Sequence, residues 1–377
     1  PYTVTHHKST LLIAGIFSFM NAGSGSNQSN HMYKLGPIHQ GIMERGSKTT
    51  SDSYVLWPAR IGPFTLVMGR HYKNMDTSSL PFSYLIESND ESILVPGINL
   101  RSVGTIRDAQ KWPKRDRRKD PEKIDQVNFN LLSPYTIRKM FEGRDLLRRI
   151  KSVAGAVSSS YTYNNMVIKG ESLERGIALY QTGINKFLGN SLIKRLENTR
   201  FKSNSDLQKK LAPDKSAGNG EWVDLAGLIA PQRMVDKLLD EIESGKLSTL
   251  EAIEEEFRNM HKSYYEWEWI WACERLEKEI GKPVNEITAS DVLSMVEKWK
   301  KSVIDLDKML YEDARKEFNL SSRTGFGIDG GEDVKKLDFE EVRGDFESNS
   351  VVSAIQDHIK QKTALGDELI ERINEIK

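Results

Sequence analysis

The sequence has a single cysteine, Cys273, among its 377 residues. One thiol excludes a disulfide within the chain, and this favours a reducing, cytoplasmic compartment. Prolines are also few, at 12, which argues against extensive disorder. We therefore expect a folded cytoplasmic protein.

Net charge and long hydrophobic runs are absent as well. Lys plus Arg and Asp plus Glu number 54 each, so the chain has no global attraction to nucleic acid or anionic membrane. The segment LLIAGIFSFM is apolar for about ten residues, which is too short to cross a bilayer. We therefore predict neither nucleic acid nor membrane as a partner.

The composition changes near residue 105. The first part is rich in Gly, Ser, Thr, Asn and aliphatic residues and has hardly any helical periodicity. The second part contains apolar residues at alternating steps of three and four, which predicts packed helix faces. Two such series are Ile253, Phe257, Met260, Tyr264, Trp267 and Trp271, and Val292, Val296, Trp299, Val303, Leu306 and Leu310.

A different period occurs in YVLWPARIGPFTLVMGRHY, residues 54–72, where Val55, Ile61 and Val67 lie six residues apart. Helices repeat at 3.6 residues and strands at 2. A period of six is typical of a left-handed parallel β-helix, in which each hexapeptide forms one short strand and one turn. Chance spacing in two ordinary strands is the alternative.

These patterns predict a multidomain β and α chain. We expect left-handed β-helix coils over residues 1–75, a β-hairpin over 76–110, a basic linker over 111–122 and an α-helical domain over 123–377. Because the chain opens with PYTV and no methionine, we expect the coils to continue upstream of residue 1. β-Helices of this type commonly pack about a threefold axis, so we also expect a homotrimer.

Histidines are concentrated near the start of the chain. Five of the seven lie in the first 71 residues, namely His6, His7, His31, His39 and His71. Because histidine titrates near neutral pH, this skew indicates a site. The spacings match no standard metal-ligand motif and no cysteine assists, so we expect no metal.

One segment, HHKSTLLIAGIFSFMNAGSGSNQSNHMYK, contains His7, then Asn21 fourteen residues later, then Gly23, Gly25 and Asn30. It resembles the active segment of hexapeptide-repeat acyltransferases, especially the domain that acetylates glucosamine 1-phosphate. That resemblance implies that His7 is the general base and that Asn21 contacts the sugar. It also implies that Gly23 and Gly25 form a tight corner against the acyl-coenzyme A.

By the same resemblance, Asn30 and the adjacent His31 would bind substrate, with Asn30 toward the acyl-coenzyme A side. The family has a tyrosine where this chain has Thr10. The structural alternative is that these asparagines only cap strand corners, because asparagine tolerates left-handed backbone angles.

The whole chain is also similar to an uncharacterised bacterial family that joins a hexapeptide β-helix to a helical carboxy-terminal domain. The resemblances together imply an acyltransferase-like protein that acts on a sugar or sugar nucleotide with an acyl-coenzyme A donor. The alternative is a non-catalytic oligomerising scaffold, in which the β-helix trimerises the chain and the helices hold a partner.

The predicted linker KWPKRDRRK is the other candidate site, with six basic residues among nine. Lys114, Arg115, Arg117 and Arg118 could contact the phosphates of a nucleotide or coenzyme A. A solvated junction between domains is the alternative, because charge runs are usually solvated.

The assignment of His7 predicts a specific kinetic defect. A His7→Ala variant should keep its fold and its acyl-coenzyme A binding, but turnover should fall about a hundred- to ten-thousandfold. The parent activity should rise with pH through a pKa of roughly 6 to 7. Acetyl transfer to amino sugars and sugar nucleotides is the assay, and an intact protein that binds no acyl-coenzyme A would contradict the assignment.

Overall fold

A computed structural model describes residues 11–21, 30, 32–155, 158–197, 201–213 and 217–376. The strands within these ranges are β1 (Leu11–Ala14), β2 (Gln40–Met43), β3 (Lys48–Thr49), β4 (Tyr54–Val55), β5 (Arg60–Ile61), β6 (Leu66–Met68), β7 (Arg70–His71), β8 (Tyr84–Ser88), β9 (Glu91–Val95), β10 (Ser160–Tyr163), β11 (Met166–Lys169), β12 (Trp222–Leu225) and β13 (Leu228–Pro231).

The α-helices are α1 (Val103–Arg115), α2 (Pro134–Val153), α3 (Gly170–Leu196), α4 (Asn204–Leu211), α5 (Gln232–Glu243), α6 (Leu250–Lys262), α7 (Tyr264–Ile280), α8 (Ala289–Arg315), α9 (Glu332–Arg343) and α10 (Ser350–Asn374). Short 3₁₀ turns cover Ile98–Arg101, Val284–Glu286, Lys316–Phe318 and Ser321–Arg323.

The described strands form four separate sheets. One has the order β1-β2-β5, one pairs β4 with β7, and one pairs β12 with β13. The largest has the order β10-β11-β9-β8-β6-β3 and contains both parallel and antiparallel pairs. Several parallel partners are 18 residues apart, as when Ile42 faces Arg60 and Lys48 faces Leu66.

The predicted left-handed parallel β-helix over residues 1–75 is wrong. The described strands divide among small sheets of two to six strands, and the largest sheet is mixed and recruits β10 and β11 from residues 160–169. Val55, Ile61 and Val67 are indeed all buried, at no more than 1% exposed. Their strands nevertheless belong to three different sheets. The spacing of six therefore indicates that the three side chains share a core, and not that their strands stack as coils.

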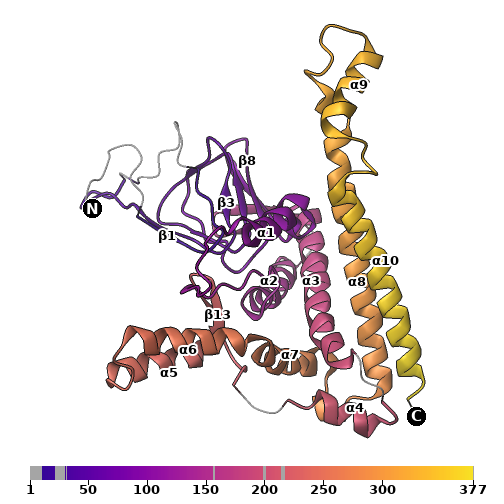
Figure 1. Ribbon diagram of the computed structural model, residues 1–377. Coiled ribbons are helices and arrows are strands. Elements are labelled where there is room, and N and C mark those ends of the chain that lie inside the picture. Colours follow the sequence, from indigo (N-terminus) through magenta and orange to yellow (C-terminus); the bar gives the residue numbers. More distant parts are fainter. Residues whose placement is uncertain are drawn as a thin grey trace.

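Residues after 105 are mostly helical, but they also contribute the four strands β10 to β13. Long helices α8 and α10 lie side by side along one edge of the molecule (Figure 1). Thr288 caps α8 in a reciprocal arrangement with Asp291, which satisfies free N–H groups of the first turn. All six apolar residues of the 292–310 series are buried, which confirms that predicted helix face.

The 253–271 series is not one helix. Helix α6 ends at Lys262 and α7 begins at Tyr264, with Ser263 between them. Trp271 is nevertheless fully buried and its ring lies edge-on to Phe187 of α3 at 5.9 Å between centroids. The prediction that this tryptophan belongs to a packed face is confirmed.

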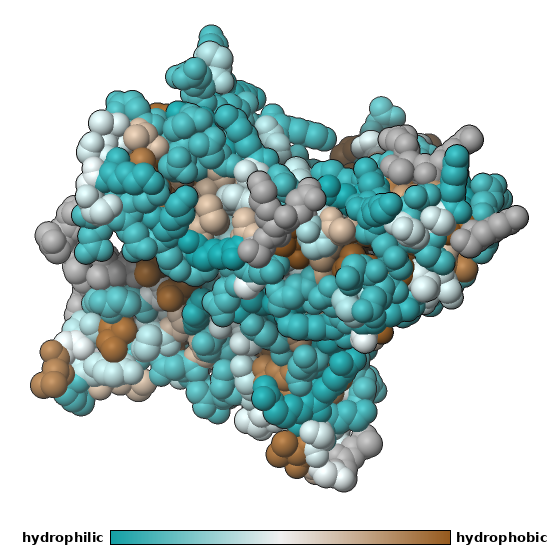
Figure 2. Space-filling model, turned by 90° about the horizontal axis from the view of Figure 1, so that it is seen from below, coloured by the Kyte–Doolittle hydropathy of each residue, from teal (hydrophilic) through white to brown (hydrophobic). Residues whose placement is uncertain are grey.

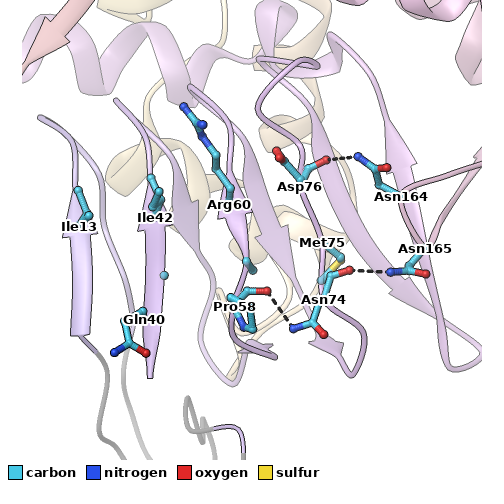
Figure 3. A pocket seen from close by; sticks show the side chains of 12 residues that line it. Ile13, Gln40, Ile42, Pro58, Arg60, Asn74, Met75, Asp76, Asn164 and Asn165 are labelled. Carbon is cyan, nitrogen blue, oxygen red and sulfur yellow. Dashed lines mark hydrogen bonds between the residues drawn. The ribbon is translucent and has the colours of Figure 1, made fainter. Parts of the chain in front are cut away.

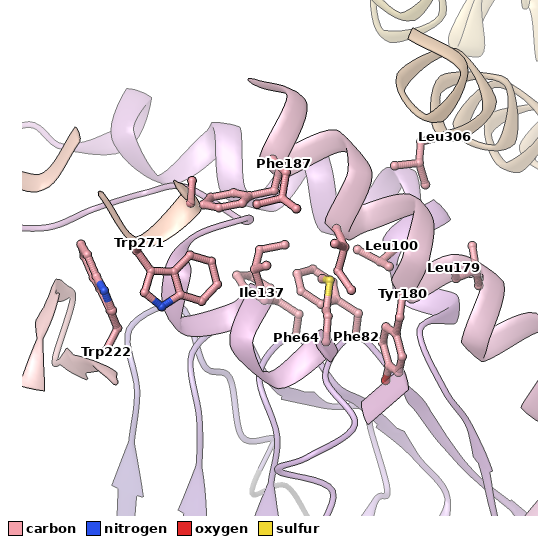
Figure 4. Close-up of a cluster of buried hydrophobic side chains, with 14 of the residues drawn as sticks. Phe64, Phe82, Leu100, Ile137, Leu179, Tyr180, Phe187, Trp222, Trp271 and Leu306 are labelled. Atoms are coloured by element: carbon pink, nitrogen blue, oxygen red, sulfur yellow. The ribbon is translucent and has the colours of Figure 1, made fainter. Parts of the chain in front are cut away.

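One continuous hydrophobic core joins the two parts of the chain (Figure 4). Phe64 and Phe82, from the turns of the β-rich part, stack with ring centroids 4.6 Å apart. Ile137 of α2 and Leu306 of α8 belong to the same cluster. Because apolar surface is removed from water jointly by strands and helices, the two parts stabilise each other.

The face of the molecule seen from below is mostly hydrophilic, and hydrophobic residues form separate spots on it (Figure 2). No helix in the described ranges is both long and apolar enough to cross a membrane.

Arg45 is the second residue after β2. Its buried side chain connects the β-rich part to the β12–β13 hairpin. Its side chain is 0% exposed, and its Nε donates to Asp224 Oδ2 at 2.8 Å. Its terminal nitrogens donate to the carbonyl oxygens of Asn128 at 2.7 Å and Gly227 at 3.0 Å. The buried charge therefore has one anionic partner and two dipolar ones.

The preceding residue, Glu44, makes a second buried cluster, with α2. Its carboxylate accepts from Tyr135 Oη at 2.6 Å and lies 3.2 Å from Lys139 Nζ. Arg60 of β5 donates its Nε to the other oxygen at 2.6 Å. Burial lowers the pKa of Lys139, although Glu44 opposes that shift.

The Arg45 contact predicts a large stability effect. Arg45→Ala leaves Asp224 buried without its cation, so the free energy of unfolding should fall by about 3–5 kcal/mol. Urea denaturation is the measurement. The matched control is Arg70→Ala, whose partner Asp52 is exposed, and this change should leave the midpoint almost unaltered. Equal effects of the two variants would contradict the assigned role of Arg45.

Candidate functional site

The outer face of the β1-β2-β5 sheet displays a row of four side chains in register. Ile13 faces Ile42, Ile42 faces Arg60, and Arg60 forms an isolated bridge to Asp76. Alternate residues of a strand share a face, so Gln40, Pro58 and Asn74, each two residues earlier, lie on the same side. The row changes from apolar to charged as it crosses the sheet.

This face lines a wide groove of about 950 Å³. Its apolar portion includes Ile13, which is 69% exposed, and Ile42 and Pro58 (Figure 3). Arg60 and Asp76 form its charged side. An exposed apolar surface beside polar groups is typical of ligand-binding sites.

The turn between β10 and β11 closes one end of the groove with two amides. Asn164 and Asn165 both have positive φ, at 45° and 63°, as both central residues of a type I′ hairpin turn require. Asn165 Nδ2 donates to the Asn74 carbonyl at 2.9 Å, and Asn164 Nδ2 lies 3.3 Å from the Asp76 carbonyl (Figure 3). These contacts join residues about 90 positions apart in the chain.

Arg60 is the cation of the groove. Partial burial disfavours its charge, but Glu44 and Asp76 raise the pKa of the guanidinium, so it stays protonated. It bonds Glu44 through Nε, and its two terminal nitrogens make no hydrogen bond with the described residues. Those nitrogens can therefore donate to a ligand acceptor such as a hydroxyl or phosphate oxygen.

The described asparagines of the predicted active segment lie outside the groove lining. Asn30 is 1% exposed, donates to the Trp57 carbonyl at 2.6 Å and accepts from the Met32 N–H at 3.0 Å. The Asn21 N–H donates to Thr49 Oγ1 at 2.7 Å, and its side chain donates to Ser51 Oγ at 3.1 Å. Both asparagines make hydrogen bonds within the protein's own fold.

His7, Gly23, Gly25 and His31 lie outside the described residues. The predicted basic linker is partly helical, because α1 includes Lys114 and Arg115.

All four candidate basic residues are exposed, and none lines the groove. Arg118 forms ion pairs with Asp116 and Asp125, so much of its charge is already neutralised.

Sequence reasoning missed the residues that do line the groove, above all Arg60, Asp76 and Asn165. A signal for one of them existed: two adjacent asparagines between SYTY and MVIK are a hairpin-turn pattern. No local pattern could show that this turn meets Asn74 and Asp76.

Two of the histidines that suggested a site are structural. His39 is 8% exposed, and His71 is fully buried. His71 Nε2 donates to the Met68 carbonyl at 3.2 Å, so its Nδ1 accepts from Ser92 Oγ at 2.8 Å. Within the described part of the chain, no group of three or more His, Cys, Asp or Glu side chains is placed to hold a metal ion.

The chain is similar to sequences of two domain families. A model described as "Domain of unknown function (DUF4954)" matches residues 1–151, and one described as "Domain of unknown function (DUF6819)" matches residues 203–373. An uncharacterized protein of Treponema pallidum (strain Nichols) is 25% identical over an alignment of 296 residues, and the match covers 70% of this chain. The chain spans 40% of the length of that curated relative. No solved structure matches.

Burial of His71 predicts a pH-dependent loss of stability. Burial lowers the pKa of His71 from 6.5 to about 4. Between these two pH values the unfolded chain binds a proton at His71 and the folded chain does not. The resulting destabilisation of the folded state is small above pH 6.5 and grows as the pH falls toward 4. Urea denaturation should show that the parent loses about 2 kcal/mol more of its free energy of unfolding than His71→Gln between pH 6.5 and 4.5. A His71 ring that titrates near pH 6.5 in NMR spectra would contradict this.

Proposed function

We propose that the protein binds a sugar or sugar nucleotide in the groove on the β1-β2-β5 face. The observation that carries this proposal is the combination of an apolar strip with planar polar side chains along one row. Sugars present hydroxyls that both donate and accept, together with apolar C–H faces. Arg60 donates, Asp76 accepts, and the amide of Asn165 can do both.

The size of the groove supports a ligand larger than one monosaccharide. A volume of about 950 Å³ lies at the upper end of the range for small-molecule sites. Arg60 could bind the phosphates of a sugar nucleotide through its terminal nitrogens, since the guanidinium matches phosphate geometry. Ile13, Ile42 and Pro58 would contact the sugar ring or base.

Acyl transfer from acyl-coenzyme A to the bound sugar is the further step of this proposal. The described groove-lining residues include no histidine, cysteine or lysine that could act as base or nucleophile. In this proposal His7 is the general base, as the resemblance to hexapeptide-repeat acyltransferases implies, and sugar binding is the part that the groove itself supports.

A homotrimeric scaffold is the second candidate. It is favoured by Ile13 and Phe19, which are 69% and 58% exposed on and just after β1. Exposed apolar residues on an edge strand are a common site of association between chains.

Removal of one groove amide should separate these candidates. Asn165→Gly keeps a residue that accepts positive φ in the turn but deletes the amide, so sugar-nucleotide affinity should fall roughly two- to tenfold. Asn89→Gly, in the β8–β9 turn with φ 53°, is the matched control and should not alter binding. Calorimetric titration with amino sugars, sugar phosphates and sugar nucleotides is the measurement.

Two outcomes would overturn the sugar-binding proposal. One is the absence of any heat of binding for all three ligand classes. The other is an Asn165→Gly variant that binds as tightly as the parent. If no ligand binds and Ile13→Asp lowers the mass measured by light scattering, the scaffold is the better description.

A further inference from the structure

A second, smaller pocket of about 200 Å³ lies where the β-rich part meets the start of α1. Lys48 of β3, Thr65 before β6 and Ser102, Gly104 and Arg107 of the α1 segment are among the residues that line it. None of these residues lines the groove.

Cationic groups exceed anionic ones beside this pocket. Asp108 forms ion pairs with Lys48, Arg107 and Lys111, so three cations share one carboxylate and the cluster has a formal charge of three minus one, or plus two. Burial lowers the pKa of Lys48, and Lys111 and Arg107 lower it further. The arrangement would be stabilised by an additional anion.

The first turn of α1 presents N–H groups to the same pocket. Ser102 caps the helix but makes no side-chain capping bond. The Val103 N–H donates to Asp313 Oδ2 at 3.0 Å, whereas the Gly104 N–H has no acceptor among the described residues. A Cβ on Gly104 would meet only Ser102 Oγ, at 3.5 Å, so the space beside the Gly104 Cα is open. Helix N-termini of this form favour anions.

An independent observation comes from the sheet side. Thr65 is fully buried and its hydroxyl has no hydrogen-bond partner in the described part of the chain. A buried hydroxyl without a partner is costly, and the great majority of such groups are satisfied in folded proteins. Because Thr65 lines the pocket, a ligand oxygen there could accept from its hydroxyl.

The two walls of the pocket are held together by Asn99. Its Nδ2 donates to the Phe64 carbonyl at 2.6 Å, and its Oδ1 accepts from Thr105 Oγ1 at 2.7 Å. The start of α1 is thus fixed against the turn that carries Thr65. The donors are positioned before any ligand arrives, which lowers the cost of binding.

We propose that this pocket binds a phosphoryl group or a similar oxyanion. Lys48 and Arg107 supply positive charge. Hydrogen bonds come from the Gly104 N–H and from the hydroxyls of Ser102 and Thr65. The group belongs either to free phosphate or to a phosphorylated small molecule. This site is separate from the groove and does not depend on sugar binding there.

The decisive variant is Thr65→Val, which replaces the hydroxyl by a methyl group of nearly equal size. Calorimetric titration of the full chain with inorganic phosphate and with glucose 1-phosphate, at low ionic strength, is the experiment. Thr65→Val should weaken binding about ten- to a hundredfold, because it removes one hydrogen bond to a charged group. Without phosphate the variant should melt no lower than the parent, since it loses an unsatisfied hydroxyl.

Controls separate this outcome from misfolding. Thr182→Val removes a hydroxyl that bonds within α3 and should leave phosphate affinity unchanged. Equal affinity for both probes would identify free phosphate as the ligand, and tighter binding of glucose 1-phosphate would identify a phosphorylated molecule. The proposal is overturned if neither probe binds the parent at millimolar concentration, or if Thr65→Val binds them as tightly as the parent.

Discussion

Two adjacent side chains, Glu44 and Arg45, join the β-rich part of the molecule to the rest. Removal of these charges from water is expensive, and only close partners offset that cost. Arg45 finds Asp224 and two carbonyl oxygens on one side, and Glu44 finds Tyr135, Lys139 and Arg60 on the other. The β12–β13 hairpin and α2 are thereby fixed to the end of β2.

The groove depends on the same cluster. Arg60 donates to Glu44 through one nitrogen, so its guanidinium is oriented from beneath while its other nitrogens remain available. Lys139 also donates to the Ser78 carbonyl at 3.1 Å, close in sequence to the groove residues Asn74 and Asp76. The charged side of the groove is therefore held by α2 as well as by the sheet. A rigid support of this kind is what precise recognition requires.

The two proposed sites are built in different ways. The groove uses side chains in register across parallel strands, and its polar end is completed by a hairpin turn from residues 164–165. The anion pocket instead uses a helix start placed against a strand turn, with Asn99 bonded to both. A ligand in one site need not occupy the other, so the two can be tested with separate variants.

Local patterns in the sequence were sufficient to predict several features. The buried face of α8 follows from apolar residues at alternating steps of three and four, because a helix places residues with this spacing on one side. The burial of Val55, Ile61 and Val67 also follows from their spacing. The same spacing led to the wrong architecture, since burial does not show which strands exchange hydrogen bonds.

Only the tertiary structure decided how the strands pair and which residues meet in the groove. β4, β5 and β6 are consecutive in sequence but belong to three sheets, because their partners lie 16 to 18 residues away or more. Asn164 meets Asp76, and Asn165 meets Asn74, through hydrogen bonds between segments some 90 residues apart. The sequence by itself determined which side chains are apolar and how often they recur. Long-range hydrogen bonds and buried ion pairs determined where those side chains lie, because their partners are not neighbours in the chain.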